Sequence, residues 1–330
     1  MTRLKLGVCV SVLWFAIACA VLLLSLPVAA QNWPSRPVRL IVPFGPGGST
    51  DLVARSIAEP LSSALGQQVI VDNRGGANGT MGTAIAARSV PDGYNYLVVY
   101  DSHASNPSLQ KNVPFDTVKD FAPIMLIGWS SMVLVVNPAT PYQTLGELIA
   151  AAKAKPGELV LGSGGIGSRG HLAMALLAGK AGFSYTQVPY KGGAQLMVDL
   201  LAGHITMQMG SVFLVSPYVK ARRLRPLAVT ATGRVTQMPD VPTVAEQGFP
   251  GYEVQTWWGI LAPAGAPKPI LQRMHAELKK TLAAPETRAR LEQLGVTIRA
   301  STPEEFARYI TSEMELWGKV VRDSKISATE

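Results

Sequence analysis

The sequence predicts an α/β protein of two domains, each with a mostly parallel sheet flanked by helices. The chain has 330 residues, more than one small core requires. Runs rich in β-branched residues alternate with runs whose apolar residues recur at helical spacing, and this alternation begins again near residue 144. Two βα series in one chain indicate two α/β domains.

Residues 1–30 are predicted to be a signal peptide. Arg3 and Lys5 precede a long apolar run, and Val28 and Ala30 occupy the −3 and −1 positions of a cleavage site. A membrane anchor is the alternative, because the apolar run approaches spanning length. The polar residues that follow at once favour cleavage after Ala30, so we expect an exported protein.

Composition excludes several kinds of site. Cys9 and Cys19 both lie in the predicted signal peptide, so no disulfide or thiolate site is expected in the mature chain. The four histidines lack H-x-x-x-H spacing, and we expect neither a metal nor a cofactor. The net charge of +8 comes from scattered basic residues without interleaved aromatic residues. This pattern suits a small anionic ligand and argues against nucleic-acid binding.

The first βα series begins at residue 38. The β-branched run 38–44 breaks at a glycine-rich turn and is followed by apolar residues four apart in 51–65, the pattern of a strand entering a helix. Further strands are predicted at 69–73, 96–100, 124–128 and 132–136, the last two joined by a loop, with a short helix at 79–89.

The second series opens at Thr144, which is placed to form a capping box with Glu147. A strand beginning at residue 159 enters a second glycine-rich turn. Later strands are predicted at 185–190, 205–209, 225–230 and 254–263, and helices at 144–154, 171–182, 192–203, 211–221 and 269–283. A final helix opens at Thr302, and its apolar stripe indicates core packing: Phe306, Ile310, Met314, Trp317 and Val321.

Two glycine-rich loops, 43–51 and 162–168, each join a strand to a helix. Glycines let the backbone turn tightly and point successive N–H groups inward. Ser49 or Thr50 is expected to cap the first helix, whose free N–H groups and dipole attract an anion. Glycine can also serve the turn alone. Two loops at equivalent places favour anion binding, because they would hold both ends of a dianion.

Enzyme motifs are incomplete. Gly162, Gly164 and Gly167 match the dinucleotide fingerprint, but no acidic residue lies between Glu158 and Asp199, where that fingerprint requires one. Neither loop contains G-x-S-x-G or is followed by a Walker lysine. We therefore expect no catalytic residues and no enzyme activity, with an exported hydrolase as the remote alternative.

Several ordered motifs carry a resemblance that runs from Pro37 to about Trp317. They include PSRPVRLIVPFGPGGSTD, VDNRGGANGTMGT, NPSLQKNVPFDTVKDFAPI, GSGGIGSRGHLA, VPYKGGAQ and WWGILAPAGAPKP. The chain resembles the receptors of tripartite tricarboxylate transporters, the Bug-type periplasmic binding proteins. The resemblance implies a type II-like Venus-flytrap fold, with two hinge crossovers expected near residues 131–135 and 253–257.

The resemblance also implies a function. Domain 1 would comprise 31–132 and 256–330, and domain 2 would comprise 133–255. A monomer in the periplasm would capture a small organic carboxylate, either a di- or tricarboxylate or an aromatic acid. It would deliver this ligand to the large and small permease components of a membrane transporter. A carboxylate sensor module that acts on a signalling partner is the alternative.

The implied ligand contacts come from backbone N–H groups and hydroxyls of the two loops and from a third motif at 190–193. His171 is expected either to contact the ligand or to make a structural hydrogen bond. Arg169 departs from the family pattern and is expected to contact the ligand or to face solvent. Asp101 also departs from the family pattern, and it is expected to lie in a loop at residues 101–103. The expected binding residues are Phe44, Gly47, Gly48, Ser49, Thr50, Asp51, Ser102, Ser163, Gly164, Gly165, Gly167, Ser168, His171, Tyr190, Lys191 and Gly192.

Overall fold

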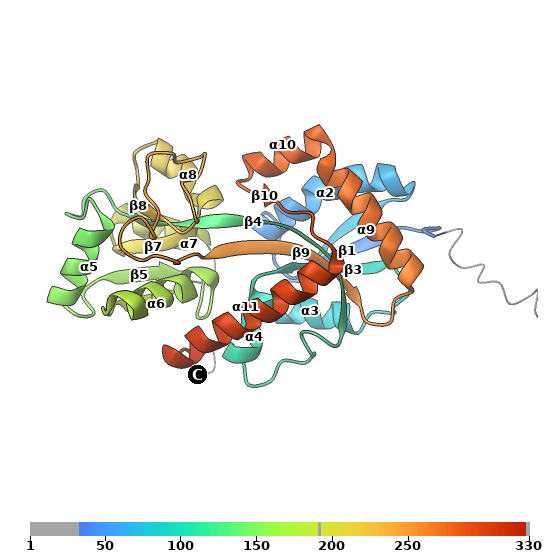
Figure 1. Cartoon of the computed structure of the whole chain (residues 1–330), viewed down its shortest axis with the longest axis horizontal. Coiled ribbons are helices and arrows are strands. Elements are labelled where there is room, and N and C mark those ends of the chain that lie inside the picture. Colours follow the sequence, from blue (N-terminus) through green and yellow to red (C-terminus); the bar gives the residue numbers. More distant parts are fainter. Residues whose placement is uncertain (1–32, 191–192, 328–330) are drawn as a thin grey trace, which may run out of the picture. The chain divides into compact units, whose positions relative to one another are not determined.

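A mixed ten-stranded sheet, with helices on both of its faces, forms the frame of the protein in the computed structural model (Figure 1). The structure describes residues 33–190 and 193–327, so the predicted signal peptide lies outside the described residues. From Arg36 onward the chain forms one compact unit. The division into domains at 132 and 255 therefore stays a prediction.

The sheet is parallel at its two ends and antiparallel in between. β1 (Val38–Val42) pairs in parallel with β2 (Val69–Asn73) and β3 (Asn95–Tyr100). β5 (Val160–Ser163) does the same with β6 (Thr186–Pro189) and β7 (Met207–Ser211). The prediction of mostly parallel sheets is therefore right for these two groups alone. The antiparallel strands are β4 (Phe121–Val136) and β9 (Gln255–Pro263), with β8 (Arg225–Val229) and β10 (Thr297–Ile298) paired to β4.

β4 corrects the prediction of two strands joined by a loop at 129–131. It is one continuous strand of 16 residues. Trp129, Ser130 and Ser131 stay in the ladder because each has a partner on β9. Beyond residue 131, β4 leaves β9 and pairs with β7 and β8. The strand thus joins the two parallel groups, and its register with β9 shifts twice before residue 129.

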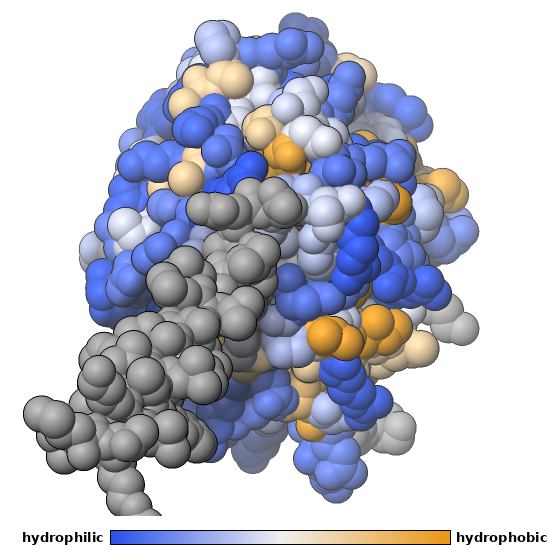
Figure 2. Space-filling view, turned by 90° about the vertical axis from the view of Figure 1, so that its right-hand side faces the viewer, coloured by the Kyte–Doolittle hydropathy of each residue, from blue (hydrophilic) through white to orange (hydrophobic). Residues whose placement is uncertain are grey.

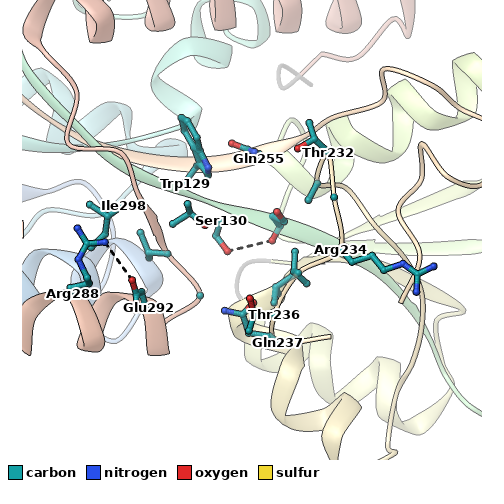
Figure 3. Close-up of a pocket in the computed structure, with 18 residues that line it drawn as sticks. Trp129, Ser130, Thr232, Arg234, Thr236, Gln237, Gln255, Arg288, Glu292 and Ile298 are labelled. Carbon is teal, nitrogen blue, oxygen red and sulfur yellow. Dashed lines mark hydrogen bonds and ion pairs between the residues drawn. The ribbon is translucent and has the colours of Figure 1, made fainter. Parts of the chain in front are cut away.

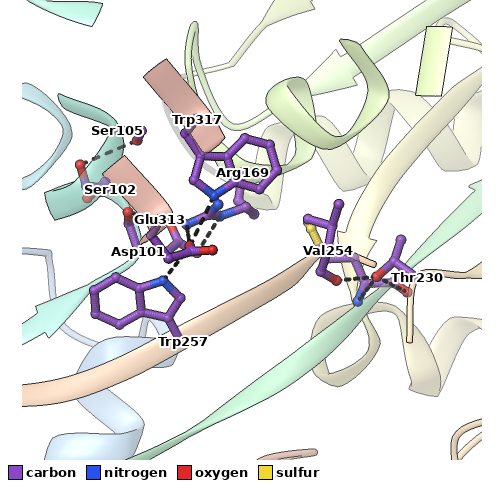
Figure 4. Close-up of polar contacts among 10 residues, drawn as sticks. Asp101, Ser102, Ser105, Arg169, Thr230, Val254, Trp257, Glu313 and Trp317 are labelled. Atoms are coloured by element: carbon purple, nitrogen blue, oxygen red, sulfur yellow. Dashed lines mark hydrogen bonds and ion pairs between the residues drawn. The ribbon is translucent and has the colours of Figure 1, made fainter. Parts of the chain in front are cut away.

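Thr230, which follows β8, ties together the two segments where hinge crossovers are expected (Figure 4). Its hydroxyl accepts from Met132 N–H at 2.9 Å and donates to the carbonyl of Val254. Its own N–H donates to Met132 O at 2.9 Å, and its carbonyl accepts from Val254 N–H at 3.1 Å. Thr230 is fully buried, so these bonds are not exposed to competition from water.

The helices largely match the predicted segments. The exceptions are α4 and α10, which were not predicted; α4 replaces the loop expected at 101–103. The sequence SHASNPSL has no apolar period, and four of its polar side chains are buried, so no helical pattern marked it. The bounds are α2 Ser49–Leu65, α3 Thr80–Ala87, α4 Ser102–Leu109, α5 Leu145–Ala154, α6 Arg169–Ala181, α7 Gly193–Ala202, α8 Val212–Lys220, α9 Lys268–Ala283, α10 Pro285–Gln293 and α11 Pro303–Asp323, with a 3-10 turn at Ala77–Gly79.

The predicted start and apolar stripe of α11 are confirmed, whereas only half of the capping box predicted for α5 forms. Thr302 and Glu305 form a complete capping box at the start of α11. The apolar stripe packs into the core, with Phe306 and Trp317 almost wholly buried. Thr144 caps α5 by accepting from Glu147 N–H at 3.1 Å, although the Glu147 carboxylate accepts from Gln143 N–H instead of completing the box.

The described surface is mostly polar. Figure 2 shows one face as largely hydrophilic, with small, separate apolar patches. Large apolar residues with substantial exposure include Met81 and Ile85 on α3 and Val90 beyond it. Within residues 33–190 and 193–327, no helix combines the length and the apolar character needed to cross a membrane.

Candidate functional site

A cavity of about 1010 Å³ brings the two glycine-rich loops together. Of the predicted binding residues, Phe44, Gly164, Gly165 and Tyr190 line it. The remaining lining comes from Gly45, Ile166, Pro189 and two segments that sequence reasoning did not assign to the site, Gly75–Gly79 and Gln110–Asn112. Among these described residues none is acidic, and Lys111 carries the charge, so the cavity favours an anion over a cation.

Asp51 holds the first loop in shape. Its carboxylate accepts from Gly47 N–H at 2.9 Å, from Asn73 Nδ2 at 3.0 Å and from Arg55 Nε at 2.9 Å. Burial acts to raise the pKa of Asp51, but the hydrogen bonds from Arg55, Gly47 and Asn73 outweigh it, and the pKa falls below its ordinary value. Asp51 therefore stays ionised, and its oxygens are used by its own loop.

The cap predicted for the first helix is wrong. The N-cap of α2 is Gly48, and neither Ser49 nor Thr50 occupies that position. Gly47 lies at φ +78°, a conformation that favours glycine, and the helix begins directly after Gly48. The helix therefore starts one residue earlier than a cap at Ser49 would require. Thr50 and Asp51 are buried, and residues 47–51 do not line the cavity. The N–H groups of Ser49 and Thr50 remain in the first helical turn, where the helix offers no acceptor.

Loop 76–79 is a strained segment that Phe44 contacts. All four residues have positive φ, including Ala77 at 48° and Asn78 at 53°. An added Cβ on Gly79 would lie 3.1 Å from Cζ of Phe44, so the ring packs closely on this loop. Backbone strain of this kind persists where neighbouring contacts enforce it and is frequent at binding sites. The glycine-rich run GGANG, between a strand and a helix, was the sequence feature that could have identified this loop as part of the site.

Amide side chains from α4 and from Gln110, the residue that follows it, hold this strained loop in place. Asn78 Nδ2 donates to Asn106 Oδ1 at 2.9 Å, and Asn106 Nδ2 donates back to Asn78 O at 3.0 Å. Gln110 Nε2 reaches Ala77 O at 3.4 Å. Asn106 is 1 % exposed, so its reciprocal pair with Asn78 fixes the loop relative to α4.

The second loop is held at its start by hydrogen bonds from β6 and from the residue that follows it. Ser163 O accepts from Tyr190 N–H at 2.8 Å, and Ser163 Oγ accepts from Gln187 Nε2 at 2.7 Å. Gly165 and Gly167 have φ of +116° and +74°, so both positions favour glycine. Gly164 has no positive φ, and an added Cβ would meet nothing within 4 Å. The turn of this loop therefore depends on Gly165 and Gly167 and not on Gly164.

The second loop keeps free backbone donors at the cavity. Among the described residues, the N–H groups of Gly164, Gly165 and Ile166 form no hydrogen bond within the chain. α6 begins directly after this loop, with Ser168 as its N-cap. Free N–H groups beside a helix N-terminus are an arrangement that binds anions, carboxylates included.

Among the described residues, the other predicted binding residues are not part of the cavity lining. His171 accepts from Gly167 N–H at 3.1 Å through Nδ1, so it has the structural hydrogen bond that was the alternative to ligand contact. Ser102 is buried at the start of α4, and Ser163, Gly167 and Ser168 do not line the cavity. The predicted contacts at Lys191 and Gly192 lie outside the described residues.

Arg169 does not face solvent, which corrects one of its two expected roles. Its side chain is 2 % exposed and forms ion pairs with Asp101 at 3.3 Å and with Glu313 at 2.9 Å (Figure 4). It is also absent from the cavity lining. Burial acts to lower the pKa of Arg169, but the two carboxylates outweigh it and raise the pKa, so the guanidinium stays charged.

A second cavity, of about 640 Å³, is lined partly by the central strands β4 and β9 (Figure 3). None of the predicted binding residues lines it. Its charged residues are paired, Arg288 with Glu292 at 3.6 Å and Arg234 with Glu246 at 3.3 Å. In the described part of the chain, no cluster of three His, Asp or Glu side chains is placed to hold a metal ion. The cavity with free N–H donors is the stronger candidate.

Stability is expected to fall on acidification because His103 is buried as a neutral group. Burial lowers the pKa of His103 to about 4, against an ordinary value near 6.5. The unfolded chain therefore binds a proton between about pH 6.5 and 4 while the folded chain does not. The free energy of unfolding should drop across this window, by about 2–3 kcal/mol between pH 7 and 4.5 from this residue.

Urea unfolding of the parent protein and of His103→Gln at both pH values checks this. The variant loses the contact of Nε2 with Thr117 O at 3.0 Å, so it should be less stable at pH 7, yet it should show a smaller loss at pH 4.5. If the free energy of unfolding fell equally in both proteins between pH 7 and pH 4.5, His103 would not be the source of the pH dependence. His171, whose pKa is also about 4 through burial, adds a similar slope to both proteins.

Comparison with known proteins decides the family. The family model of the tripartite tricarboxylate transporter family receptor matches residues 53–326. The chain belongs to this receptor family. The resemblance stated from the sequence motifs is thus confirmed, and so is the α/β periplasmic-binding-protein fold. Receptors of this family bind solutes and are not enzymes, as expected.

Curated and solved relatives cover almost the whole receptor. It is 38 % identical to the "UPF0065 protein in tcbD-tcbE intergenic region" of Pseudomonas sp. (strain P51) over 90 % of this chain and 89 % of that protein. It is similar to the periplasmic binding protein BugD (TM-score 0.81, 34 % identity, 89 % and 99 % covered). It is also similar to Rpa4515 of R. palustris, solved with adipate (TM-score 0.83, 33 % identity, 89 % and 99 % covered).

Proposed function

We propose that this receptor binds a small organic carboxylate, a di- or tricarboxylate or an aromatic acid, in the cavity between its two glycine-rich loops. The observation that carries the proposal is the composition of the cavity. Both loops line it, three of its N–H groups have no hydrogen-bond partner among the described residues, and its described lining includes Lys111 and no acidic residue. Neutral donors hold a carboxylate without a permanent buried ion pair, which suits a ligand that must later be released.

The comparisons support this ligand class. Rpa4515 was solved with adipate, and MatC from Rhodopseudomonas palustris was solved with malate (TM-score 0.79, 29 % identity). We further propose that the chain is exported to the periplasm, is cleaved after Ala30 and acts as a monomer. There it would deliver its ligand to the large and small permease components of a tripartite transporter.

A thermal-shift screen with adipate, malate and benzoate tests the ligand class. A ligand present at about 100 times its dissociation constant stabilises the folded state by about 2.7 kcal/mol, which corresponds to a rise of roughly 5 °C in melting temperature. At least one of the three acids should produce such a rise. Adipamide, which has the length of adipate without its charge, is the matched control and should produce none.

The same samples separate a receptor from an enzyme. The stabilising acid should be recovered unchanged after prolonged incubation with the protein. An equal shift with adipamide would contradict carboxylate recognition. Consumption of the acid with growth of a product would contradict the receptor function itself.

A further inference from the structure

A buried cluster of charges joins three segments that are far apart in the sequence (Figure 4). Arg169 Nη2 lies 2.9 Å from Glu313 Oε2, and Arg169 Nε lies 3.3 Å from Asp101 Oδ2. Arg169 Nη2 also donates to the backbone carbonyl of Asp101 at 3.3 Å. The side chains are 2 %, 11 % and 2 % exposed for Arg169, Glu313 and Asp101, so all three charges are largely removed from water.

Two tryptophans fix the geometry of this cluster. Trp257 Nε1 and Trp317 Nε1 both donate to Glu313 Oε2, at 2.7 and 3.0 Å. The guanidinium of Arg169 also lies 4.3 Å above the Trp317 ring, a cation–π contact. Glu313 therefore cannot follow Arg169 without losing its tryptophan donors, and its position is set by α11 and β9.

The pair of Arg169 with Asp101 connects elements that lie next to two of the segments lining the ligand cavity. Arg169 is the first residue of α6, directly after the second glycine-rich loop. Asp101 directly precedes α4, the helix whose Asn106 holds loop 76–79. The Arg169–Asp101 pair thus connects the start of one loop-bearing helix to the start of the other. Both residues were departures from the family pattern, and the structure shows that they pair with each other.

We propose that Arg169 is a positioning residue whose buried ion pairs set the spacing between the second glycine-rich loop and loop 76–79 across the ligand cavity. Separating the two loops would pull the guanidinium away from carboxylates that have little access to water. That separation would leave buried charges without a partner, which costs far more than sliding apolar surfaces over one another. The ion pairs therefore restrain the cavity width without contacting the ligand.

Distance measurement between two spin labels tests this in the ligand-free protein. With Cys9 and Cys19 replaced by serine, cysteines introduced at Ile85 on α3 and at exposed Lys180 on α6 are unique labelling sites. α3 and α6 are the helices that follow the two loops. The parent should give a narrow distribution, and Arg169→Met should shift or broaden it by more than about 2 Å. An unchanged distribution would overturn the proposal.

Arg225→Met is the matched control. Arg225 donates to the carbonyls of Pro138, Thr140 and Tyr142, all within the predicted domain 2, so its loss should leave the label distance unchanged. If Arg169→Met does not fold, Glu313→Gln decides the question. Its amide oxygen can still accept from both tryptophans while one charge is removed. It should widen the distribution in part, and no widening would overturn the proposal.

A second readout, ligand affinity, rests on the proposed function. If Arg169→Met reduces the population of the binding-competent spacing to about a tenth, adipate or malate should bind about tenfold more weakly. Arg169→Lys keeps the charge but not the guanidinium fork and should recover part of this loss. The label distances are measured without ligand, so failure to bind adipate or malate would count against the proposed function and not against the role of Arg169.

Discussion

The Arg169→Met substitution is expected to lower the free energy of unfolding by about 3–5 kcal/mol, the usual effect of removing one partner from a buried ion pair. Methionine fills a similar space but leaves Asp101 and Glu313 facing each other without a cation. Burial already raises the pKa of Asp101 above its ordinary value, with Arg169 acting in the opposite direction. Loss of the guanidinium removes that compensation.

Urea unfolding with an unchanged m value measures this loss. Arg225→Met removes a guanidinium that binds three carbonyls in a partly buried place, and it should cost about 1–3 kcal/mol. Adding Glu313→Gln to Arg169→Met should restore part of the stability, because one stranded charge disappears. A loss for Arg169→Met no greater than that for Arg225→Met would contradict the account of the cluster.

The Gly167→Val substitution is expected to weaken binding of adipate or malate on the order of 100-fold. Gly167 lies at φ +74°, a conformation that β-branched residues adopt poorly. An added Cβ would lie 2.3 Å from Cδ1 of Leu109, the last residue of α4. The Leu109 side chain or the loop must move, and together with the unfavourable φ this should disturb the arrangement of the N–H groups in the second loop. Strain of about 1–3 kcal/mol corresponds to this loss.

Gly164→Ala provides the contrast, because that position has an ordinary φ and open space for a methyl group. Its dissociation constant, measured by calorimetric titration, should change by less than about threefold, within the range of ordinary surface substitutions. If both variants lost the same amount of affinity, added side-chain bulk and not the backbone conformation at Gly167 would account for the loss. That result would contradict a role for the turn at Gly167.

Elements with a regular apolar period could be predicted from the sequence. The strand–helix alternation and the stripe of α11 depend on local patterns, and both are present in the structure. β4 could not be read correctly because GWSS resembles a loop, and its pairing with β9 joins residues more than 120 positions apart. α4 was missed because its sequence has no amphipathic period. Its polar residues Ser105 and Asn106 are buried by contacts with the rest of the chain, which the local sequence does not reveal.

The candidate site was predictable in kind but not in detail. Glycine-rich turns marked both loops, and the cavity includes residues from each. The contribution of loop 76–79 depends on amide bonds from a helix that was not predicted. Arg169 was expected either to contact ligand or to face solvent. Its actual partners, Asp101 and Glu313, are 68 and 144 residues away, a proximity that no local pattern reveals.

A crystal structure with the acid that raises the melting temperature tests the central claim most directly. The carboxylate oxygens are expected within hydrogen-bond distance of the N–H groups of Gly164, Gly165 and Ile166, with no contact to Arg169. A ligand seated in the other cavity, beside Trp129 and Arg288, would contradict the account, as would a carboxylate paired with the Arg169 guanidinium.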